Sequence, residues 1–169
     1  MNPRPEAEMP AMSDYGVEED SWNPLSWEWA AARLSAPRNY WLATVDANGR
    51  PAASPVWGVW DDDRLRYAFG CAANSRKARN IAANPQVVLT TEDTVEAISL
   101  EGAAELVTDP DRIDGWLKLF VKKYGHEVGP EYEAFMRSNP IYAIAPRVAF
   151  AMIEHPDDFA TRATRWRFG

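Results

Sequence analysis

The hydrophobic pattern of the chain predicts a series of short strands. Apolar positions alternate with polar ones, or form short β-branched and aromatic runs, and each run ends at turn residues. Asn48-Gly49 is a typical hairpin turn, and Asp61-Asp62-Asp63 marks the next turn. The expected strands cover residues 40–45, 51–60, 64–70, 86–91, 96–107, 141–145 and 148–154. Strands joined by such tight turns pair in antiparallel fashion.

Helical spacing of apolar residues is confined to a few segments. The expected helices begin near residues 24, 75, 110 and 131 and end near residues 34, 84, 124 and 137. Helices at the edges of about six short strands favour a small β-barrel, because closure leaves no unpaired strand edge. The strand–helix alternation of a doubly wound parallel sheet is missing. We therefore expect a mainly β fold with peripheral helices.

Composition sets the size and class of the protein. The chain has 169 residues, of which 46% are hydrophobic and 25% charged, which suits one soluble globular domain. Residues 1–20 are rich in Pro, Glu, Met and Ser without periodicity, so we expect a flexible arm there and one domain over 21–169. No run approaches the roughly 18 apolar residues of a membrane span. The single cysteine, Cys71, fits a reducing compartment, and we expect a cytoplasmic protein.

Segment 74–80 (NSRKARN) carries the strongest candidate chemistry. It lies between a strand-like run and a helix-like run. Ser75 can cap the helix, while Arg76 and Lys77 offer a planar fork of donors and a compact charge, and both suit a phosphate. The unpaired N–H groups at a helix start also favour an anion. A solvated basic helix start explains the same residues, and composition alone leaves both interpretations open.

Other chemistry finds little support in the sequence. The net charge of −7 argues against general nucleic-acid binding, which needs a broad basic surface. His126 and His155 lie in no cluster with the spacing of metal ligands, so we expect no metal site. Glycine-rich phosphate loops, a nucleophile elbow and a Cys–His pair are missing. No side chain is singled out as a catalytic acid or base.

The order of elements around segment 74–80 resembles the flavin-phosphate segment of the pyridoxamine 5′-phosphate oxidase family. A strand, a short loop, Ser-Arg-Lys-Ala, a helix ending at Asn84-Pro85 and a further strand follow one another. Residues 40–51 (YWLATVDANGRP) look like the family's opening hairpin, residues 54–57 (SPVW) like its second strand, and residues 100–107 (LEGAAELV) like a later strand. The resemblance covers about residues 27–154 and implies a split β-barrel that binds FMN across a homodimer interface.

The likeness to the vitamin-converting members of that family stops at the C-terminus. Their substrate-binding Arg and His have no clear counterpart, and the tail 163–168 (ATRWRF) differs. Residues 55–60, segment 75–80 and the tail look more like the flavin/deazaflavin oxidoreductases, many of which use coenzyme F420. This likeness implies hydride transfer between F420 and a small electron-poor substrate, such as an enone or a quinone. An FMN-dependent oxidoreductase, a cofactor carrier with little turnover and a haem-binding barrel are the alternatives.

The resemblance also implies roles for particular residues. Arg76 and Lys77 would hold the phosphate, and Ser75 and Asn80 would add hydrogen bonds to it. Backbone groups of the second strand would hold the polar edge of the ring; these residues are Ser54, Pro55, Val56 and Trp57. The side chain of Trp57 would also form a wall of the pocket. Trp166 would cover the ring from the partner subunit, or would anchor the C-terminal tail by packing. The expected partners are a second copy of the chain and a small-molecule substrate, with no nucleic acid and no membrane.

Overall fold

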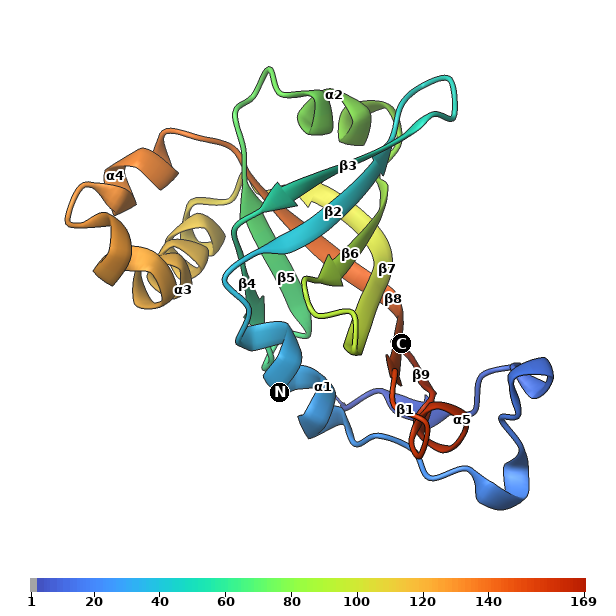
Figure 1. Ribbon diagram of the computed structural model, residues 1–169. Coiled ribbons are helices and arrows are strands. Elements are labelled where there is room, and N and C mark those ends of the chain that lie inside the picture. The colour runs from blue at the N-terminus through green and yellow to red at the C-terminus, as the bar shows by residue number, and fades with distance from the viewer. Residues whose placement is uncertain (1–2) are drawn as a thin grey trace.

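One curved antiparallel sheet forms the body of the protein (Figure 1). The computed structural model describes residues 3–169. The strands follow the order β1-β9-β8-β7-β6-β2-β3, and β5 pairs with both β8 and β4. The strands are β1 (Glu6–Glu8), β2 (Tyr40–Val45), β3 (Pro51–Val56), β4 (Gly58–Asp61), β5 (Arg66–Gly70), β6 (Gln86–Thr91), β7 (Glu96–Leu106), β8 (Ile141–Ile153) and β9 (Thr164–Arg167). The α-helices are α1 (Trp27–Ser35), α2 (Arg76–Ala83), α3 (Pro110–Val128), α4 (Tyr132–Arg137) and α5 (Phe159–Arg162).

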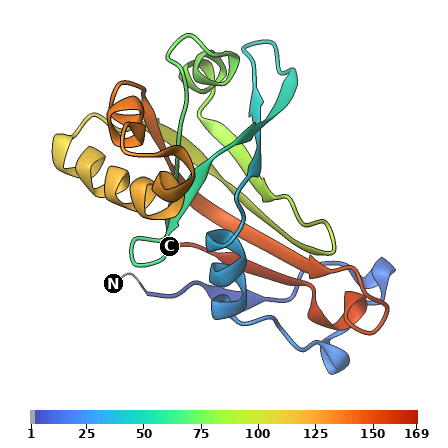
Figure 2. The same ribbon diagram turned by 60° about the vertical axis from the view of Figure 1, so that its left-hand side comes forward.

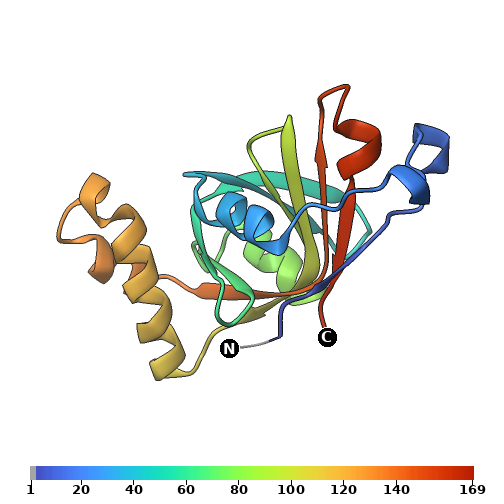
Figure 3. The same ribbon diagram turned by 90° about the horizontal axis from the view of Figure 1, so that it is seen from below.

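The sheet curls around the main hydrophobic core, and α1 and α2 cover its two ends. Along β2, Tyr40 and Leu42 are fully buried while Trp41 between them is exposed, because successive side chains of a strand point to opposite faces. Helix α1 adds Leu34 to this core, and α2 adds Ile81. Figure 3 shows α1 lying across the near opening of the barrel, with α2 behind it. The expected mainly β fold with peripheral helices is confirmed.

Helices α3 and α4 lie outside the barrel and pack on a second apolar cluster (Figure 2). The buried face of α3 carries Trp116 and Phe120, which pack together with Val59 of β4. Asp109 caps α3, since its carboxylate accepts a hydrogen bond from the Arg112 backbone N–H at 2.8 Å. Within residues 3–169, no helix is both long and apolar enough to cross a membrane.

Strand boundaries differ from the sequence pattern in two places. The expected strand 51–60 is divided at Trp57, because β3 pairs with β2 whereas β4 pairs with β5. The expected strands 141–145 and 148–154 are one strand, β8. Pro146 is tolerated inside β8 because the register with β7 shifts there and leaves Arg147 as the extra residue of a bulge. A Cβ on Gly102, the partner of Pro146, would lie 2.2 Å from Ala145 O, so this close approach requires glycine.

The N-terminal segment contains regular structure where the composition indicated a flexible arm. Of the expected arm 1–20, residues 1 and 2 lie outside the described part of the chain. Glu6–Glu8 forms β1 on the edge of β9, and Val17 is only 2% exposed. Glu8 also pairs with Arg167 at 2.8 Å. A strand of this kind is held by main-chain hydrogen bonds to its neighbour, so its polar side chains leave no hydrophobic pattern to detect.

Candidate cofactor site

The start of α2 presents the residues expected to bind a phosphate. Ser75 caps the helix, since its Oγ accepts a hydrogen bond from the Ala78 backbone N–H at 3.3 Å. Arg76 is exposed and Lys77 is half-buried. In the part of the chain that the structure describes, neither cation is paired with a carboxylate. Two cations and the first N–H groups of a helix are thus available together to an anion.

Asn80 lies on the inner side of α2 and has a partner within the protein. It is 5% exposed, and its Nδ2 donates a hydrogen bond to Thr44 Oγ1 at 2.9 Å. A buried amide needs such an internal partner, because it has given up its hydrogen bonds to water. Asn80 thus ties α2 to β2, and its expected bond to the cofactor stays a prediction.

Strand β3 carries the backbone groups expected to hold a ring. One edge of β3 pairs with β2, and its other edge has no strand partner within residues 3–169. Along this strand Ser54 is half-buried, Pro55 is exposed and the side chain of Val56 enters the core. Peptide groups on an unpaired strand edge keep their capacity for hydrogen bonds. This edge can therefore receive the polar rim of a flat ligand.

Trp57 stands at the junction of β3 and β4, where side chains from other elements hold it. Its indole stacks on Tyr124 of α3, with ring centroids 4.8 Å apart and an interplanar angle of 11°. The Arg38 guanidinium lies 4.5 Å from the centre of the same indole, and Tyr132 of α4 meets it edge-on. The indole is half-buried and fixed in place, which suits a wall at the end of β3.

Two consecutive residues of α3 extend this junction beyond what sequence reasoning identified. Lys123 Nζ donates hydrogen bonds to Tyr40 Oη at 2.7 Å and to Gly58 O at 3.0 Å. Tyr124 Oη accepts a hydrogen bond from the Gly58 N–H at 3.0 Å. Burial lowers the pKa of Lys123 to about 8 and raises the pKa of Tyr124 to about 12. The apolar spacing of α3 includes Tyr124, but nothing local to the sequence distinguishes Lys123 from a solvated lysine.

Trp166 belongs to the core of its own chain. It is 1% exposed, pairs with Ala149 of β8 and meets Trp27 edge-on at 5.6 Å. This burial matches the alternative expectation of a packed C-terminal anchor, and the expected contact of Trp166 with a cofactor stays a prediction.

Neither histidine is enclosed by the fold. The side chains of His126 and His155 are 73% and 58% exposed, and each lies beside acidic residues. Among residues 3–169, no group of three or more His, Cys, Asp and Glu side chains is placed to hold a metal ion. The haem alternative needs a histidine inside a pocket, and neither of these two side chains meets that need.

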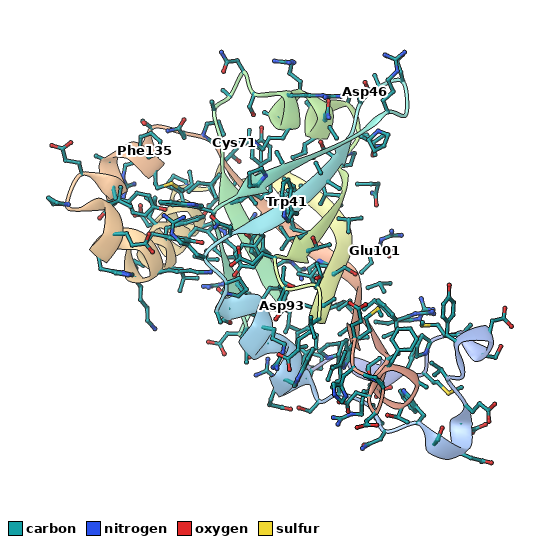
Figure 4. The ribbon with its side chains drawn as sticks, viewed as in Figure 1. Trp41, Asp46, Cys71, Asp93, Glu101 and Phe135 are labelled. Carbon is teal, nitrogen blue, oxygen red and sulfur yellow. The ribbon has the colours of Figure 1, made fainter. Side chains whose placement is uncertain are left out.

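Trp41 lies on the outer face of β2 (Figure 4), where its neighbours on adjacent strands are mostly small apolar residues, with Thr90 beside them. Trp41 is 49% exposed and lies opposite Pro55 of β3. We call this surface the outer-face patch; it consists of Trp41, Ala43, Ala53, Pro55 and Val88, which are linked by the strand register. An exposed tryptophan among small apolar side chains is typical of a surface that another protein covers.

The donor set as a whole fits a flat cofactor that carries a phosphate. The cations of α2 suit the phosphate, and the free edge of β3 suits the rim of a ring system. Thr44 connects the two parts, since its Oγ1 accepts from Asn80 of α2 and lies 3.5 Å from Ala52 O of β3. These two contacts connect α2 to β3 through β2.

Known proteins resemble this chain in sequence. The family model described as pyridoxamine 5′-phosphate oxidase matches residues 27–152. A pyridoxine/pyridoxamine 5′-phosphate oxidase from Cupriavidus taiwanensis is 33% identical over 135 residues, which cover 77% of this chain and 62% of the relative. A protein of the same name from Cupriavidus necator is 34% identical over 115 residues, which cover 67% of this chain and 52% of the relative. The chain thus spans less than two thirds of the length of these relatives.

Solved structures share the fold. A conserved hypothetical protein from Mycobacterium tuberculosis superposes with a TM-score of 0.66 at 22% identity, over 78% of this chain and 86% of that one. An F420 reductase superposes with a TM-score of 0.55 at 27% identity, over 70% of this chain and 93% of that one. The matched residues 27–152 include both the β3 edge and the start of α2. On these grounds the chain belongs to the pyridoxamine 5′-phosphate oxidase family.

Proposed function

We propose that the protein is an oxidoreductase that binds coenzyme F420 and transfers hydride between F420 and a small electron-poor substrate of the enone or quinone type. The observation that carries the proposal is the pair of cations Arg76 and Lys77, which bond no carboxylate within residues 3–169. They lie on a helix that Thr44 connects to β3, the strand with an open edge. The F420 reductase of the same fold supports the choice of F420. FMN is the alternative cofactor, because the same donors suit its phosphate.

The protein's own part in such a reaction is binding and orientation. A bound deazaflavin supplies hydride chemistry, and the protein supplies position and electrostatics. Arg76 and Lys77 hold the phosphate, and Ser75 adds the donor capacity of its hydroxyl. The free edge of β3 orients the ring, and the fixed indole of Trp57 limits the space beside it.

The proposed active unit is a homodimer that buries the outer-face patch. Strand β3 carries Ala53 and Pro55 of the patch as well as the ring-holding backbone, so a second copy seated there would close over the cofactor. Trp41→Arg is expected to convert the dimer to a monomer in analytical ultracentrifugation, because the arginine would bring a charge into an apolar contact. Phe135→Arg, on the 62% exposed Phe135 of α4, is the matched control and keeps the dimer. A Trp41→Arg protein that stays dimeric would place the interface elsewhere.

A titration with F420 and FMN side by side tests the cofactor assignment. We expect a colourless protein that binds F420 at least about ten-fold more tightly than FMN, a difference of about 1.4 kcal/mol. Arg76→Ala combined with Lys77→Ala is expected to weaken F420 binding by about ten-fold, since charge-assisted bonds to exposed cations are worth less than sheltered ones. Lys118→Ala combined with Lys122→Ala removes the same charge from an exposed face of α3 and leaves the affinity unchanged. Equal losses in the two double variants would contradict the phosphate assignment.

The same preparation separates the alternative functions. Yellow protein with flavin absorbance identifies FMN as the cofactor. Tight binding of F420 without hydride transfer to any member of a panel of enones and quinones identifies a cofactor carrier. Hydride transfer to at least one of these acceptors, lost on removal of F420, is the result that we expect.

A further inference from the structure

We propose that Lys123 is a positioning residue for the cofactor: together with Tyr124 it forms a clamp on Gly58 that sets the conformation of the Trp57 end of the ring-holding strand. This inference rests on the proposed function, because it assumes that residues 54–57 hold the ring. The clamp itself is a property of the protein without cofactor and can be examined there.

The clamp binds both backbone polar groups of one residue, Gly58, and so holds the two peptide units on either side of its Cα. Gly58 N–H donates to Tyr124 Oη at 3.0 Å, and Gly58 O accepts from Lys123 Nζ at 3.0 Å. Tyr124 Oη lies 2.9 Å from Gly58 O and also 2.9 Å from Arg38 O, and its one proton serves one of these carbonyls at a time. Gly58 is therefore bonded to α3 through both its donor and its acceptor.

A buried ring closes the side of Gly58 on which a side chain would stand. A Cβ at this position would lie 2.0 Å from Tyr67 Oη and 2.6 Å from Ala68 O. Tyr67 is fully buried, so this ring is a rigid backing for the Gly58 backbone. Gly58 is thus packed against Tyr67 in one direction and bonded to Lys123 and Tyr124 through its backbone. Trp57 precedes Gly58 and stacks on Tyr124, so the clamp also fixes the indole.

Lys123 also links the clamp to the rest of the barrel end. Its Nζ donates to Tyr40 Oη at 2.7 Å, and Tyr40 Oη donates in turn to Leu34 O at the end of α1 at 2.7 Å. One amine thus joins α3, β2, α1 and the β3–β4 junction. Removing its charge weakens all of these bonds at once, because hydrogen bonds from an ionised donor are about twice as strong as neutral ones.

The surroundings of Lys123 make its charge sensitive to pH. The groups that face it are Tyr40 from β2 and Tyr124 from its own helix. The charged residues Arg38 and Glu127 act on Tyr124, and Glu92 acts on both tyrosines. Within residues 3–169, no carboxylate pairs with Lys123. Burial lowers the pKa of Lys123 to about 8, whereas the pKa values of Tyr40 and Tyr124 are raised by burial. As pH rises from neutral, Lys123 is therefore the first member of the clamp to lose a proton, and it becomes neutral.

Amide hydrogen exchange in the cofactor-free protein tests the clamp. Tyr124→Phe removes the acceptor of the Gly58 N–H, and we expect the exchange of this amide to accelerate by at least about ten-fold. Lys123→Met is expected to accelerate it less, because it removes only the bond to Gly58 O. Unchanged protection of the Phe120 amide in α3 shows that each variant is folded. Unchanged protection of the Gly58 amide in a folded Tyr124→Phe protein would overturn the clamp.

The pH dependence of cofactor binding tests the positioning role. Between pH 6.5 and 9.5 we expect the dissociation constant of the wild-type protein to rise about five-fold, with its midpoint near the pKa of Lys123, about 8. Lys123→Met is expected to be weak at every pH. Lys123→Arg keeps its charge and is expected to bind within about three-fold of the wild-type protein at neutral pH. Its dissociation constant should not rise between pH 6.5 and 9.5.

The outcomes distinguish this inference from the proposed function. If the dissociation constant still rises with pH in both variants, the rise is due to the ligand, and the positioning role is overturned. A Lys123→Met protein that binds as tightly as the wild-type protein at every pH would overturn it too. In either case the F420 or FMN assignment stands. If the wild-type protein binds neither cofactor, the proposed function fails and the positioning role fails with it, and the exchange data still decide whether the clamp exists.

Discussion

The tight packing around Gly58 gives a quantitative prediction for Gly58→Ala. The new Cβ would lie 2.0 Å from Tyr67 Oη and 2.2 Å from Tyr67 Cζ, so the ring would have to retreat by about 1.4 Å to reach the 3.4 Å at which ordinary contact begins. Tyr67 is fully buried and meets Tyr40 edge-on at 4.9 Å, so a shift of its ring would disturb the packing of the core. Overpacking a core costs about 1–3 kcal/mol. Because a ring and the Ala68 carbonyl are both in the way, we expect a loss of about 3 kcal/mol.

Gly115→Ala is the matched control for this experiment. A Cβ at Gly115 meets nothing within 4 Å, and the residue lies inside α3, where alanine is favoured over glycine by about 0.5–1 kcal/mol. For a chain of this length 1 kcal/mol changes Tm by about 2–4 °C. In thermal unfolding followed by circular dichroism, Gly58→Ala should lower Tm by about 6–12 °C, while Gly115→Ala should raise it by about 1–4 °C. A Gly58→Ala protein that melts with the wild-type protein would refute the reasoning.

Other contacts in the structure have equally direct consequences. Trp166→Ala should lower the free energy of unfolding in urea by about 3–5 kcal/mol, because it empties a fully buried site. Asn80→Ala should cost about 1–3 kcal/mol in the same assay, since Thr44 Oγ1 loses its buried donor; an equal loss in Thr44→Val combined with Asn80→Ala would contradict this account. Stability should fall as pH rises above about 10, where unfolded tyrosines ionise, because burial raises the pKa of Tyr124 to about 12 in the folded chain. Tyr124→Phe should make that fall shallower, and an unchanged slope would show that Tyr124 is not its source.

Local pattern was sufficient for much of the fold. The bounds of β2 follow from alternation and from the Asn48-Gly49 turn, and the start of α2 follows from the cap at Ser75. The barrel follows from short strands, tight turns and few helices. All of these features depend on residues that are close together in sequence, where propensity and periodicity are informative.

The parts that sequence did not predict depend on distant residues. The break at Trp57 exists because β3 and β4 pair with different strands, and β8 passes through Pro146 because a bulge opposite Gly102 makes room. The role of Lys123 depends on Gly58, which is 65 positions away in the chain. The position of Asn80 in the motif predicts a residue that binds the phosphate. Only the fold shows that its amide turns inward to Thr44.

The open edge of β3 also bears on how the protein avoids aggregation. A strand edge with unpaired peptide groups is a template on which a strand of another chain can add. Pro51 and Pro55 stand on this edge strand, and neither has a backbone N–H to donate to an incoming strand. A continuous ladder of hydrogen bonds therefore cannot form along β3, whereas a small molecule that needs only a few of its carbonyl and amide groups is still accommodated.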